Sequence, residues 1–425
     1  MVTTSVLKNN VLLITESVEC ARTVSIGFWF AAGSRYERDG QHGISHFCEH
    51  LLFKGCAAFG AEPARSAHEI AAAFDRIGGY VNAFTEREAV CVYCTVPAES
   101  SSVATALSVL SGMAEHADFP EEELERERAV VKSEIVASLD DSEEAAFDAA
   151  ASAVWPGQSV SASISGSMSD LDGLLRGDVC AWYENYFAKG ELTVCAAGAV
   201  SEELLRPVLE TLSVHRPVRR FHFGSPPVWK PGTCFVSAPF RSQQLFLLYP
   251  CALPETMQDY CTMSVMNALA GDTMSSRLFE ALREKSGFCY TVYSFFTFYE
   301  DAALWSAYCS CEKRNALPVS RILHAELEAL RTGSITEDEL KAAKEHLCGE
   351  EIIGSEDMEF RMKRLQRNHA LGFPQVETDD IIMNIRAVSQ DSVRSMLNAL
   401  FNIEKKAFVS YGPALSAKTR RDMLT

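Results

Sequence analysis

The stretch GISHFCEHLLFKG, residues 43–55, places two histidines four positions apart, with a glutamate directly before the second. Each residue of an α-helix advances about 100°, so His46, Glu49 and His50 project to one face. Two neutral imidazoles at this spacing can bind one zinc ion through ring nitrogens at about 2.0–2.1 Å. Glu49 is angled away from His50, where a carboxylate can act as a general base toward a water molecule. The alternative interpretation is a solvated helix face, because short motifs recur by chance.

Two features of this segment favour the metal site over the solvated face. Ile44, Phe47 and Leu51 form an apolar stripe, which predicts that the helix packs against a core. Histidine and glutamate side chains next to such a stripe are costly to bury without a partner. A metal ion would be that partner.

A catalytic zinc site needs a third protein ligand, and the segment FPEEELERERAVVKSEIVASLDD, residues 119–141, offers one. Val131, Ile135 and Leu139 recur every four residues and are expected to form the buried stripe of a helix. Glu127 and Glu134 both flank that stripe and lie two turns apart, nearly in line. The spacing alone does not choose between these two carboxylates, and a charged helix edge is the alternative interpretation.

Composition limits the classes of protein and partner. A chain of 425 residues predicts two or three domains, and its formal net charge of −18 argues against nucleic acid or an anionic membrane as the partner. No apolar run approaches the ~18 residues of a membrane span, and the first twenty residues lack a secretory pattern, so we expect a cytoplasmic protein. The 14 cysteines are scattered singly, which favours buried free thiols.

Cys91 and Cys94 form a CxxC pattern within AVCVYCTVP, which has the β-branched and aromatic residues of a strand. Residues three apart on a strand face opposite sides of the sheet. The pattern therefore predicts two separate buried thiols and argues against a redox or zinc motif.

The order of predicted elements repeats along the chain. A segment rich in proline, glycine and basic residues, 215–232, is expected to link two domains, 1–214 and 233–425. Each half is expected to contain two strands, two helices, two strands, a helical block and a closing strand. The helical block of the first half is predicted at 99–116, 120–139, 143–155 and 170–187. We therefore expect a duplicated α+β fold with antiparallel-rich sheets packed by helices. The metal motif is not duplicated, because the matching helix of the second half, YCTMSVMNALAG, lacks histidine and glutamate.

Three stretches in this order, HFCEHLLFKG, GGYVNAFTEREAVCVY and ERERAVVKSEI, resemble the pitrilysin family of inverted zincins. The similarity is to its short members, the mitochondrial processing peptidase type and its bacterial relatives. The resemblance implies that His46, His50 and Glu134 bind one zinc ion per chain. It also implies that Glu49 is the catalytic base and Glu127 a nearby supporting carboxylate.

Two further segments gain a functional interpretation from the resemblance. The stretch VNAFT, with Asn82, Ala83 and Phe84, matches an edge strand on which a peptide substrate pairs main chain to main chain. Without the resemblance, an internal strand is the simpler interpretation. In SSRLFEALREKSGFCYTVYS, local rules make Arg283 a complement to the helix dipole. The resemblance instead implies that Arg283 and Tyr290 stabilise the oxyanion of a tetrahedral intermediate.

Taken together, the resemblance implies a zinc metalloendopeptidase that acts on peptides or unfolded polypeptides. It implies two homologous α/β-roll domains that enclose a cavity, and a dimer, with a homodimer the simpler form because this chain holds every motif. A catalytically inactive scaffold, or a subunit that is active only with a homologous partner, is the alternative. Zinc content and the activity of the purified chain distinguish these cases.

Overall fold

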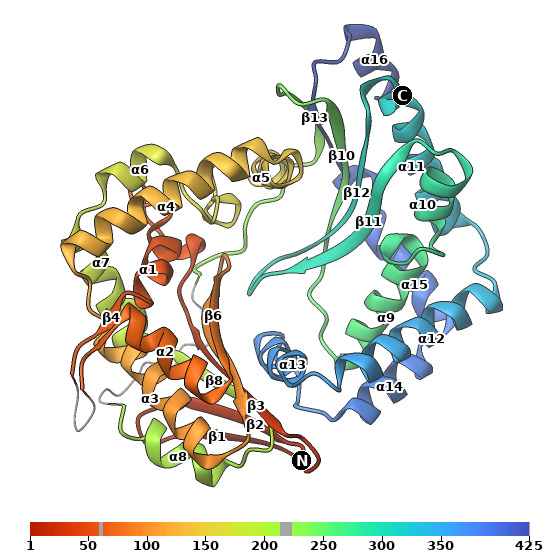
Figure 1. Ribbon diagram of the computed structural model, residues 1–425. Helices are drawn as coiled ribbons and strands as arrows, with labels where there is room; N and C mark the ends of the chain where they lie inside the picture. Colours follow the sequence, from red (N-terminus) through yellow and green to blue (C-terminus); the bar gives the residue numbers. More distant parts are fainter. Residues whose placement is uncertain (59–62, 213–222, 425) are drawn as a thin grey trace. The chain divides into compact units, whose positions relative to one another are not determined.

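The computed structural model describes residues 1–58, 63–212 and 223–424. It divides into two compact units (Figure 1). The first unit comprises Met1–Ala137, Ala162–His222 and Gly354–Glu377, and the second comprises Ser138–Ser161, Phe223–Ile353 and Thr378–Thr425. The predicted linker, 215–232, lies partly outside the described residues, so the boundary between two homologous halves stays a prediction. Among the described residues, every helix is too short or too polar to span a lipid bilayer.

The first unit is built on a six-stranded sheet in the order β1-β2-β8-β3-β7-β6. Its strands are β1 Val2–Val6, β2 Leu12–Ser17, β3 Thr23–Phe30, β6 Tyr80–Thr85, β7 Val90–Pro97 and β8 Leu192–Gly198, and β4 Gly55–Cys56 pairs with β5 Arg65–Ser66. Its helices are α1 Ile44–Leu52, α2 Ala67–Ile77, α3 Ser100–His116, most of α4 Glu121–Asp140, α6 Met168–Gly173, α7 Arg176–Tyr183, the π-helical turn η3 Glu184–Ala188, α8 Glu202–Leu209 and α13 Met358–Ala370, with the short η1 Ser34–Tyr36.

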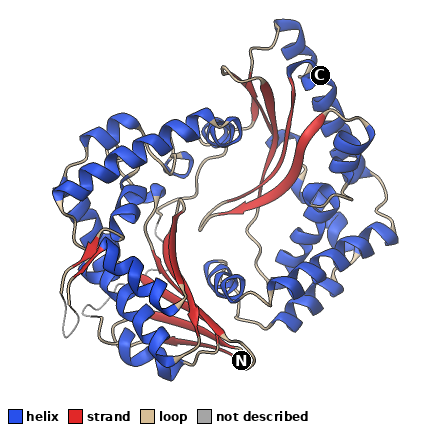
Figure 2. Cartoon of the chain, in the orientation of Figure 1, coloured by secondary structure: helices blue, strands red, loops and turns tan. Residues whose placement is uncertain are grey.

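Helices cover both faces of this sheet (Figure 2). One face packs against α1, α2, α3, α7 and α8 in the larger apolar core. The other face packs against α13, whose Met362 and Leu365 are buried against Trp29 of β3 and Cys195 of β8. A sheet covered on both faces explains why β3 and β8 are almost continuously apolar.

A buried ion pair also binds α13 to the sheet. Arg364 Nη2 lies 3.0 Å from each carboxylate oxygen of Glu16 on β2, and Arg361 donates to the same carboxylate. The side chains of Arg364 and Glu16 are only 1% and 3% exposed. Water therefore solvates neither charge, and direct contact between the two side chains contributes to the compensation of both.

We expect Glu16→Ala to lower the free energy of unfolding by about 3–5 kcal/mol, because it leaves the Arg364 guanidinium buried without its counter-charge. Urea unfolding followed by circular dichroism measures the change. Glu19→Ala, at an exposed glutamate three residues further on, is the matched control and should shift stability by less than about 0.5 kcal/mol. Equal stability of the two variants would contradict the role given to the ion pair.

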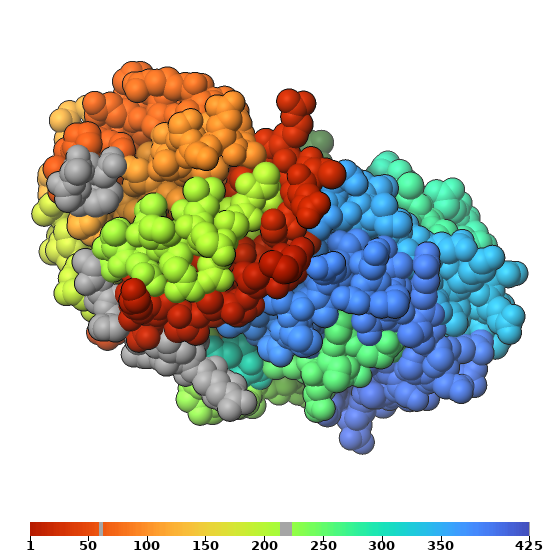
Figure 3. Space-filling model, turned by 90° about the horizontal axis from the view of Figure 1, so that it is seen from below, coloured from red at the N-terminus to blue at the C-terminus, as the bar shows by residue number. Residues whose placement is uncertain are grey.

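The strand β1 was not predicted from the sequence. Its residues, VTTSV, are polar and only partly buried, so they lack the apolar alternation that marks a strand. Pairing holds it instead, because Thr3 Oγ1 lies 2.7 Å from Thr15 Oγ1 on β2 and donates to Glu202 at the start of α8. Figure 3 shows these red N-terminal strands beside the yellow-green segment that contains α8.

The second unit is built on a five-stranded sheet in the order β11-β12-β10-β13-β9. Its strands are β9 Gly232–Ser237, β10 Ser242–Cys251, β11 Cys289–Phe298, β12 Ala303–Glu312 and β13 Ala407–Gly412. Its helices are α5 Ser142–Val154, α9 Met257–Asn267, α10 Arg277–Phe279, α11 Ala316–Thr332, α12 Glu337–Gly354, α14 Thr378–Ala387, α15 Gln390–Leu400 and α16 Ala417–Asp422. Shorter helical turns are η2 Ser159–Ser161, η4 Ala268–Asp272, η5 Glu280–Lys285, η6 Lys313–Asn315 and η7 Ile403–Lys405.

The two sheets share one topology. Counted from the β6 edge, five strands of the first sheet run β6-β7-β3-β8-β2, and β1 is added antiparallel beyond β2. Counted from the β11 edge, the second sheet has the matching series of five, β11-β12-β10-β13-β9. In both, the last pair is parallel and the other pairs are antiparallel. In both, one helix from a distant part of the chain covers one face: α13 in the first unit and α5 in the second. This repetition is what a duplicated α+β fold requires.

Two expectations about helices are wrong. A single helix was predicted at 170–187, but the structure has three helical segments there, α6, α7 and η3. The helical structure breaks between α6 and α7 at Leu174 and Leu175. Arg128 of α4 donates to the carbonyls of Leu171 and Leu174 and so binds the groups that would continue the helix. In α4, Val131 and Ile135 are buried as expected, but Leu139 is 62% exposed, because the last turn of the helix leaves the core.

The interpretation of the CxxC pattern is confirmed. Cys91 lies in the core that faces α13, and Cys94 lies in the core on the opposite face of the same strand. Burial raises the pKa of both thiols, that of Cys94 to about 12. Neither thiol has the lowered pKa of a reactive CxxC motif.

Candidate metal centre

The helix α1, which carries the opening motif, begins at a position fixed by another side chain. Its N-cap is Gly43, which has φ 93° and no side chain to accept a hydrogen bond. Glu37 supplies the acceptor from the preceding loop: its carboxylate accepts from the backbone N–H of Gly43 at 2.8 Å and of Ser45 at 2.9 Å. Ile44, Phe47 and Leu51 are fully buried, so the predicted apolar stripe is confirmed.

The helix α4 is held in place by its buried Arg128, whose guanidinium also lies 5.4 Å from the centre of the Phe47 ring on α1. This contact joins the two helices that carry the candidate ligands. It fixes which face of α4 is presented to α1, and that face carries both Glu127 and Glu134.

Three side chains converge between α1 and α4: His46, His50 and Glu134. His50 Nε2 lies 3.2 Å from His46 Nε2 and 3.2 Å from Glu134 Oε2, and His46 Nε2 lies 3.7 Å from the same carboxylate oxygen. All are partly buried, and these are the residues that could hold a metal ion in the described part of the chain. A residue 84 positions further along the sequence thus joins the pair on α1.

The spacing of the three atoms fits a tetrahedral ion. Ligands at about 2.0–2.1 Å on the corners of a tetrahedron are about 3.3 Å from one another, close to the 3.2–3.7 Å found here. The donor set of two imidazoles and one carboxylate is a catalytic zinc set, with one coordination position left for water or substrate. The residues present therefore fit zinc.

Electrostatics favour the metal-binding form of His46. Burial, together with the neighbouring His50, lowers the pKa of His46 to about 4. Its imidazole is neutral at ordinary pH and has a lone pair to offer. Burial raises the pKa of Glu49, while the hydrogen bond from Thr85 acts in the opposite direction. A carboxylate with a raised pKa binds a proton more readily than an ordinary glutamate does.

Glu127 acts on the far side of His50. Its Oε2 lies 3.1 Å from His50 Nδ1, and its Oε1 lies 2.7 Å from Lys54 Nζ. When Nδ1–H donates to this carboxylate, Nε2 keeps its lone pair and faces His46 and Glu134. The two acids that the sequence left open thus occupy different places: Glu134 lies within the cluster and Glu127 lies behind it.

We expect Glu127→Gln to weaken zinc binding about 10–100-fold, because the amide holds the His50 ring less firmly and removes the negative charge behind it. Competition with a chromophoric chelator measures the affinity. Glu121→Gln, an exposed change at the start of the same helix, is the control and should leave the affinity unchanged. Equal affinities of the two variants would refute the supporting role of Glu127.

The predicted substrate strand is β6, at the edge of the first sheet. Asn82 is exposed, and Ala83 and Phe84 are partly buried. Asn82 Oδ1 accepts from the backbone N–H of Ala83 at 2.9 Å, and its amide donates to Tyr93. One residue further on, Thr85 Oγ1 donates to Glu49 Oε2 at 2.5 Å, so the strand is joined directly to the motif on α1.

The second unit contains the predicted pair Arg283 and Tyr290. Arg283 Nη1 donates to the carbonyl of Tyr290, and its guanidinium lies 5.8 Å from the centre of the Tyr290 ring. The pairing register of β11 and β12 shifts at Tyr290, between Cys289 and Thr291, and the side chain is 78% exposed. A β-bulge thus turns the phenol out of the sheet beside the arginine.

Two residues of this centre were not identified from the sequence: Thr85 and Lys54. Thr85 is the last residue of the stretch VNAFT that was singled out as a substrate strand, but its hydroxyl was given no partner. Lys54 lies four residues after His50, which places it on the same side of the turn that ends α1. The four-residue spacing from His50 could therefore have identified Lys54 as a residue near the metal centre. The Thr85 contact joins two elements distant in sequence, and no local pattern predicts it.

Comparisons with known proteins show the family to which this chain belongs. Residues 12–167 match the Insulinase (Peptidase family M16) model, and residues 174–347 match the Peptidase M16 inactive domain model. A Bacillus subtilis protein named as an uncharacterized zinc protease is 30% identical over 409 residues, covering 93% of this chain and 94% of that protein. An uncharacterized zinc protease of Streptomyces coelicolor is 28% identical, covering 92% of this chain and 85% of that protein. The chain belongs to the peptidase M16 family, and the resemblance found in the sequence is confirmed.

Solved structures show the same fold. A peptidase M16 inactive domain from Pseudomonas fluorescens has a TM-score of 0.86 at 17% identity, covering 98% of this chain and 99% of that one. A protease from Helicobacter pylori has a TM-score of 0.85 at 18% identity, covering 97% and 99%. A chain of complex III from Candida albicans has a TM-score of 0.79 at 16% identity and covers all of both chains. The predicted class, a two-domain mixed α/β fold, is confirmed.

Proposed function

We propose that this chain is a zinc-dependent endopeptidase that cleaves peptides or unfolded polypeptide segments. The observation that carries the proposal is the convergence of His46, His50 and Glu134 at ligand distances, with Glu49 beside them. Membership of a family whose relatives are named zinc proteases supports it. In this proposal the three side chains hold one zinc ion per chain. When bound there, zinc would polarise the peptide carbonyl and acidify a water molecule.

Glu49 moves the protons of the proposed reaction. It takes a proton from the attacking water and returns it to the nitrogen of the leaving amine. Thr85 donates to Glu49 Oε2, so the other carboxylate oxygen, Oε1, remains for the water. The raised pKa of Glu49 suits both halves of this task, because the group must accept a proton and then release it.

The edge strand β6 presents the substrate in this proposal. An extended peptide adds to an exposed strand edge through main-chain hydrogen bonds, which explains acceptance of many sequences. Asn82, Ala83 and Phe84 lie along that edge, and Thr85 at its end contacts the proposed base. A bond held on this strand is therefore brought to the residues that would cleave it.

Arg283 and Tyr290 supply positive charge and a hydrogen-bond donor to the oxyanion in the proposed reaction. We expect Arg283→Gln to lower kcat about 10²–10³-fold while zinc content stays the same, because only the transition state carries that charge. Steady-state cleavage of a fluorogenic peptide measures kcat. Arg314→Gln, on the exposed turn after β12, is the control. An unchanged kcat in Arg283→Gln would remove this residue from the reaction.

We further propose that the protein works as a homodimer in the cytoplasm, since one chain holds every motif. Light scattering of the purified chain tests the dimer, and a monomer at micromolar concentration would contradict it. This chain retains all three candidate metal ligands, His46, His50 and Glu134. Their retention argues against the alternative of an inactive scaffold.

One experiment tests the proposal directly. The purified chain is incubated with a peptide library, with and without one equivalent of zinc, and products are identified by mass spectrometry. We expect internal cleavage that depends on zinc. A chain that binds one zinc but cleaves only after a homologous subunit is added would instead be a partner-dependent subunit. A chain that binds no stoichiometric zinc would be a scaffold.

A further inference from the structure

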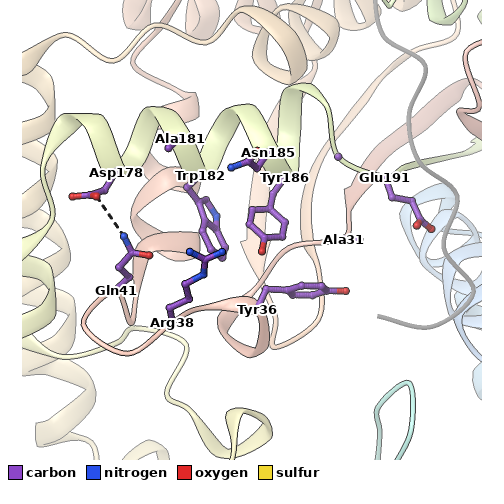
Figure 4. Close-up of a pocket in the computed structure, with 11 residues that line it drawn as sticks. Ala31, Tyr36, Arg38, Gln41, Asp178, Ala181, Trp182, Asn185, Tyr186 and Glu191 are labelled. Carbon is purple, nitrogen blue, oxygen red and sulfur yellow. Dashed lines mark hydrogen bonds between the residues drawn. The ribbon is translucent and has the colours of Figure 1, made fainter. Parts of the chain in front are cut away.

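A cavity of about 420 Å³ lies within the first unit, apart from the candidate metal centre (Figure 4). One wall is the loop that follows β3, with Tyr36 and Arg38. The other wall is formed by α7 and η3, with Trp182, Asn185 and Tyr186. The volume falls within the usual range for small-molecule sites, and π-helical turns such as η3 recur at functional sites.

Hydrogen-bond donors without partners gather in this cavity. Trp182 is 6% exposed, and its indole Nε1–H has no hydrogen-bond partner among the described residues. Arg38 is exposed and forms no ion pair within the described part of the chain. Figure 4 shows its guanidinium pointing toward the Trp182 ring, with the Asn185 amide further along the same wall. The buried indole N–H lacks the acceptor that buried donors normally have, and the exposed guanidinium beside it can pair with an anion in place of water.

The carboxylates at the cavity are already engaged. Asp178 accepts from Gln41 Nε2 at 3.4 Å and from the backbone N–H of Leu175 at 2.9 Å. The charge of Glu191 acts on His369, whose pKa it raises against the larger lowering effect of burial. Within the described residues, neither acid forms an ion pair with Arg38. They also place two negative charges at the margin of the cavity, which disfavours a ligand with two negative charges of its own.

Three aromatic side chains also line the cavity. The ring centres of Trp182 and Tyr186 are 4.1 Å apart, and Tyr36 meets Tyr186 edge-on at 5.7 Å. Rings held in such a cluster offer rigid apolar area to a flat partner with little loss of side-chain entropy. The cavity thus combines a cationic donor end with an aromatic body.

We propose that this cavity binds a monocarboxylate with a flat apolar body, such as an aromatic amino acid whose amine is blocked. The carboxylate pairs with Arg38 and reaches the indole N–H once the flexible arginine side chain moves off it. The apolar body lies against Tyr36 and Tyr186. The same chemistry is offered by a free small acid and by the C-terminal residue of a short peptide. This site is independent of the proposed peptidase reaction.

Isothermal titration of the full chain tests the proposal, with divalent metals removed by chelator so that carboxylate binding to a metal is not counted. The probes are N-acetyl-L-phenylalanine, its C-terminal amide, phenyl phosphate, and a tripeptide ending in phenylalanine. We expect N-acetyl-L-phenylalanine to bind at least tenfold more tightly than its amide or phenyl phosphate. Binding of the tripeptide as well would identify peptide termini as a source, and its failure to bind would restrict the site to free acids.

Matched variants locate the binding. Arg38→Gln should weaken N-acetyl-L-phenylalanine at least tenfold, and Trp182→Phe should weaken it severalfold while keeping a ring in place. Arg22→Gln, at an exposed arginine elsewhere in the first unit, makes the same change of charge and should have no effect. Equal affinity for acid and amide, equal loss in Arg22→Gln and Arg38→Gln, or no binding at millimolar concentration would each overturn the proposal.

Discussion

The Glu49→Gln variant is expected to keep one equivalent of zinc and to lose peptide cleavage by a factor of about 10²–10⁴. The amide is the same size as the carboxylate and leaves the imidazoles of His46 and His50 in place, so the metal cluster remains complete. It has no basic oxygen to accept the proton of the attacking water. Zinc is measured by atomic emission on dialysed protein, and cleavage is measured with a fluorogenic peptide.

The control for this variant is Glu121→Gln, which makes the same chemical change at the exposed start of α4. It should keep both zinc and full activity. Thr85→Val adds an intermediate test, because it removes the hydrogen bond to Glu49 without touching a ligand. Full cleavage by Glu49→Gln at unchanged zinc content would show that Glu49 is not the base.

The His50→Ala variant is expected to lose both zinc and activity, and this is the larger of the two effects. His50 touches every other member of the cluster: its Nε2 lies 3.2 Å from both His46 and Glu134, and its Nδ1 contacts Glu127. Removing one of three protein ligands lowers metal affinity by orders of magnitude. Dialysed protein should contain less than about a tenth of an equivalent of zinc.

His68→Ala is the matched control, since His68 is an exposed histidine on α2. It should retain one equivalent of zinc. Circular dichroism shows whether His50→Ala still folds, and a folded variant without zinc is the expected outcome. Zinc retained by a folded His50→Ala variant would mean that the metal is held elsewhere.

Local patterns predicted the two helices of the candidate centre well. The helix expected within residues 43–55 is Ile44–Leu52, and the helix expected at 120–139 is Glu121–Asp140. An apolar stripe and an acidic first turn depend only on residues that are close together in the sequence. Both patterns can therefore be recognised without knowledge of the rest of the chain. The two-turn spacing also placed Glu127 and Glu134 on one side of α4, where both are found against His50.

Long-range packing could not be predicted in the same way. The apolar residues Met362 and Leu365 indicate that α13 has a buried face. The sequence around them does not indicate which of the two sheets this face covers. The same holds for α5, whose Ala146 and Ala150 pack in the second unit although α4 directly precedes it in the chain. The choice between two similar sheets is made by tertiary contacts such as the Arg364–Glu16 pair, and a sequence pattern does not contain them.

The placement of α13 in the first unit has a consequence for synthesis on the ribosome. The strands that carry Trp29, Cys91 and Cys195 have all been synthesised once residue 198 is added. The helix that covers this face, α13, is complete only at residue 370. A nascent chain that stops near residue 350 would expose this apolar face and be prone to aggregate. The first unit can therefore complete its core only when nearly the whole polypeptide has been made.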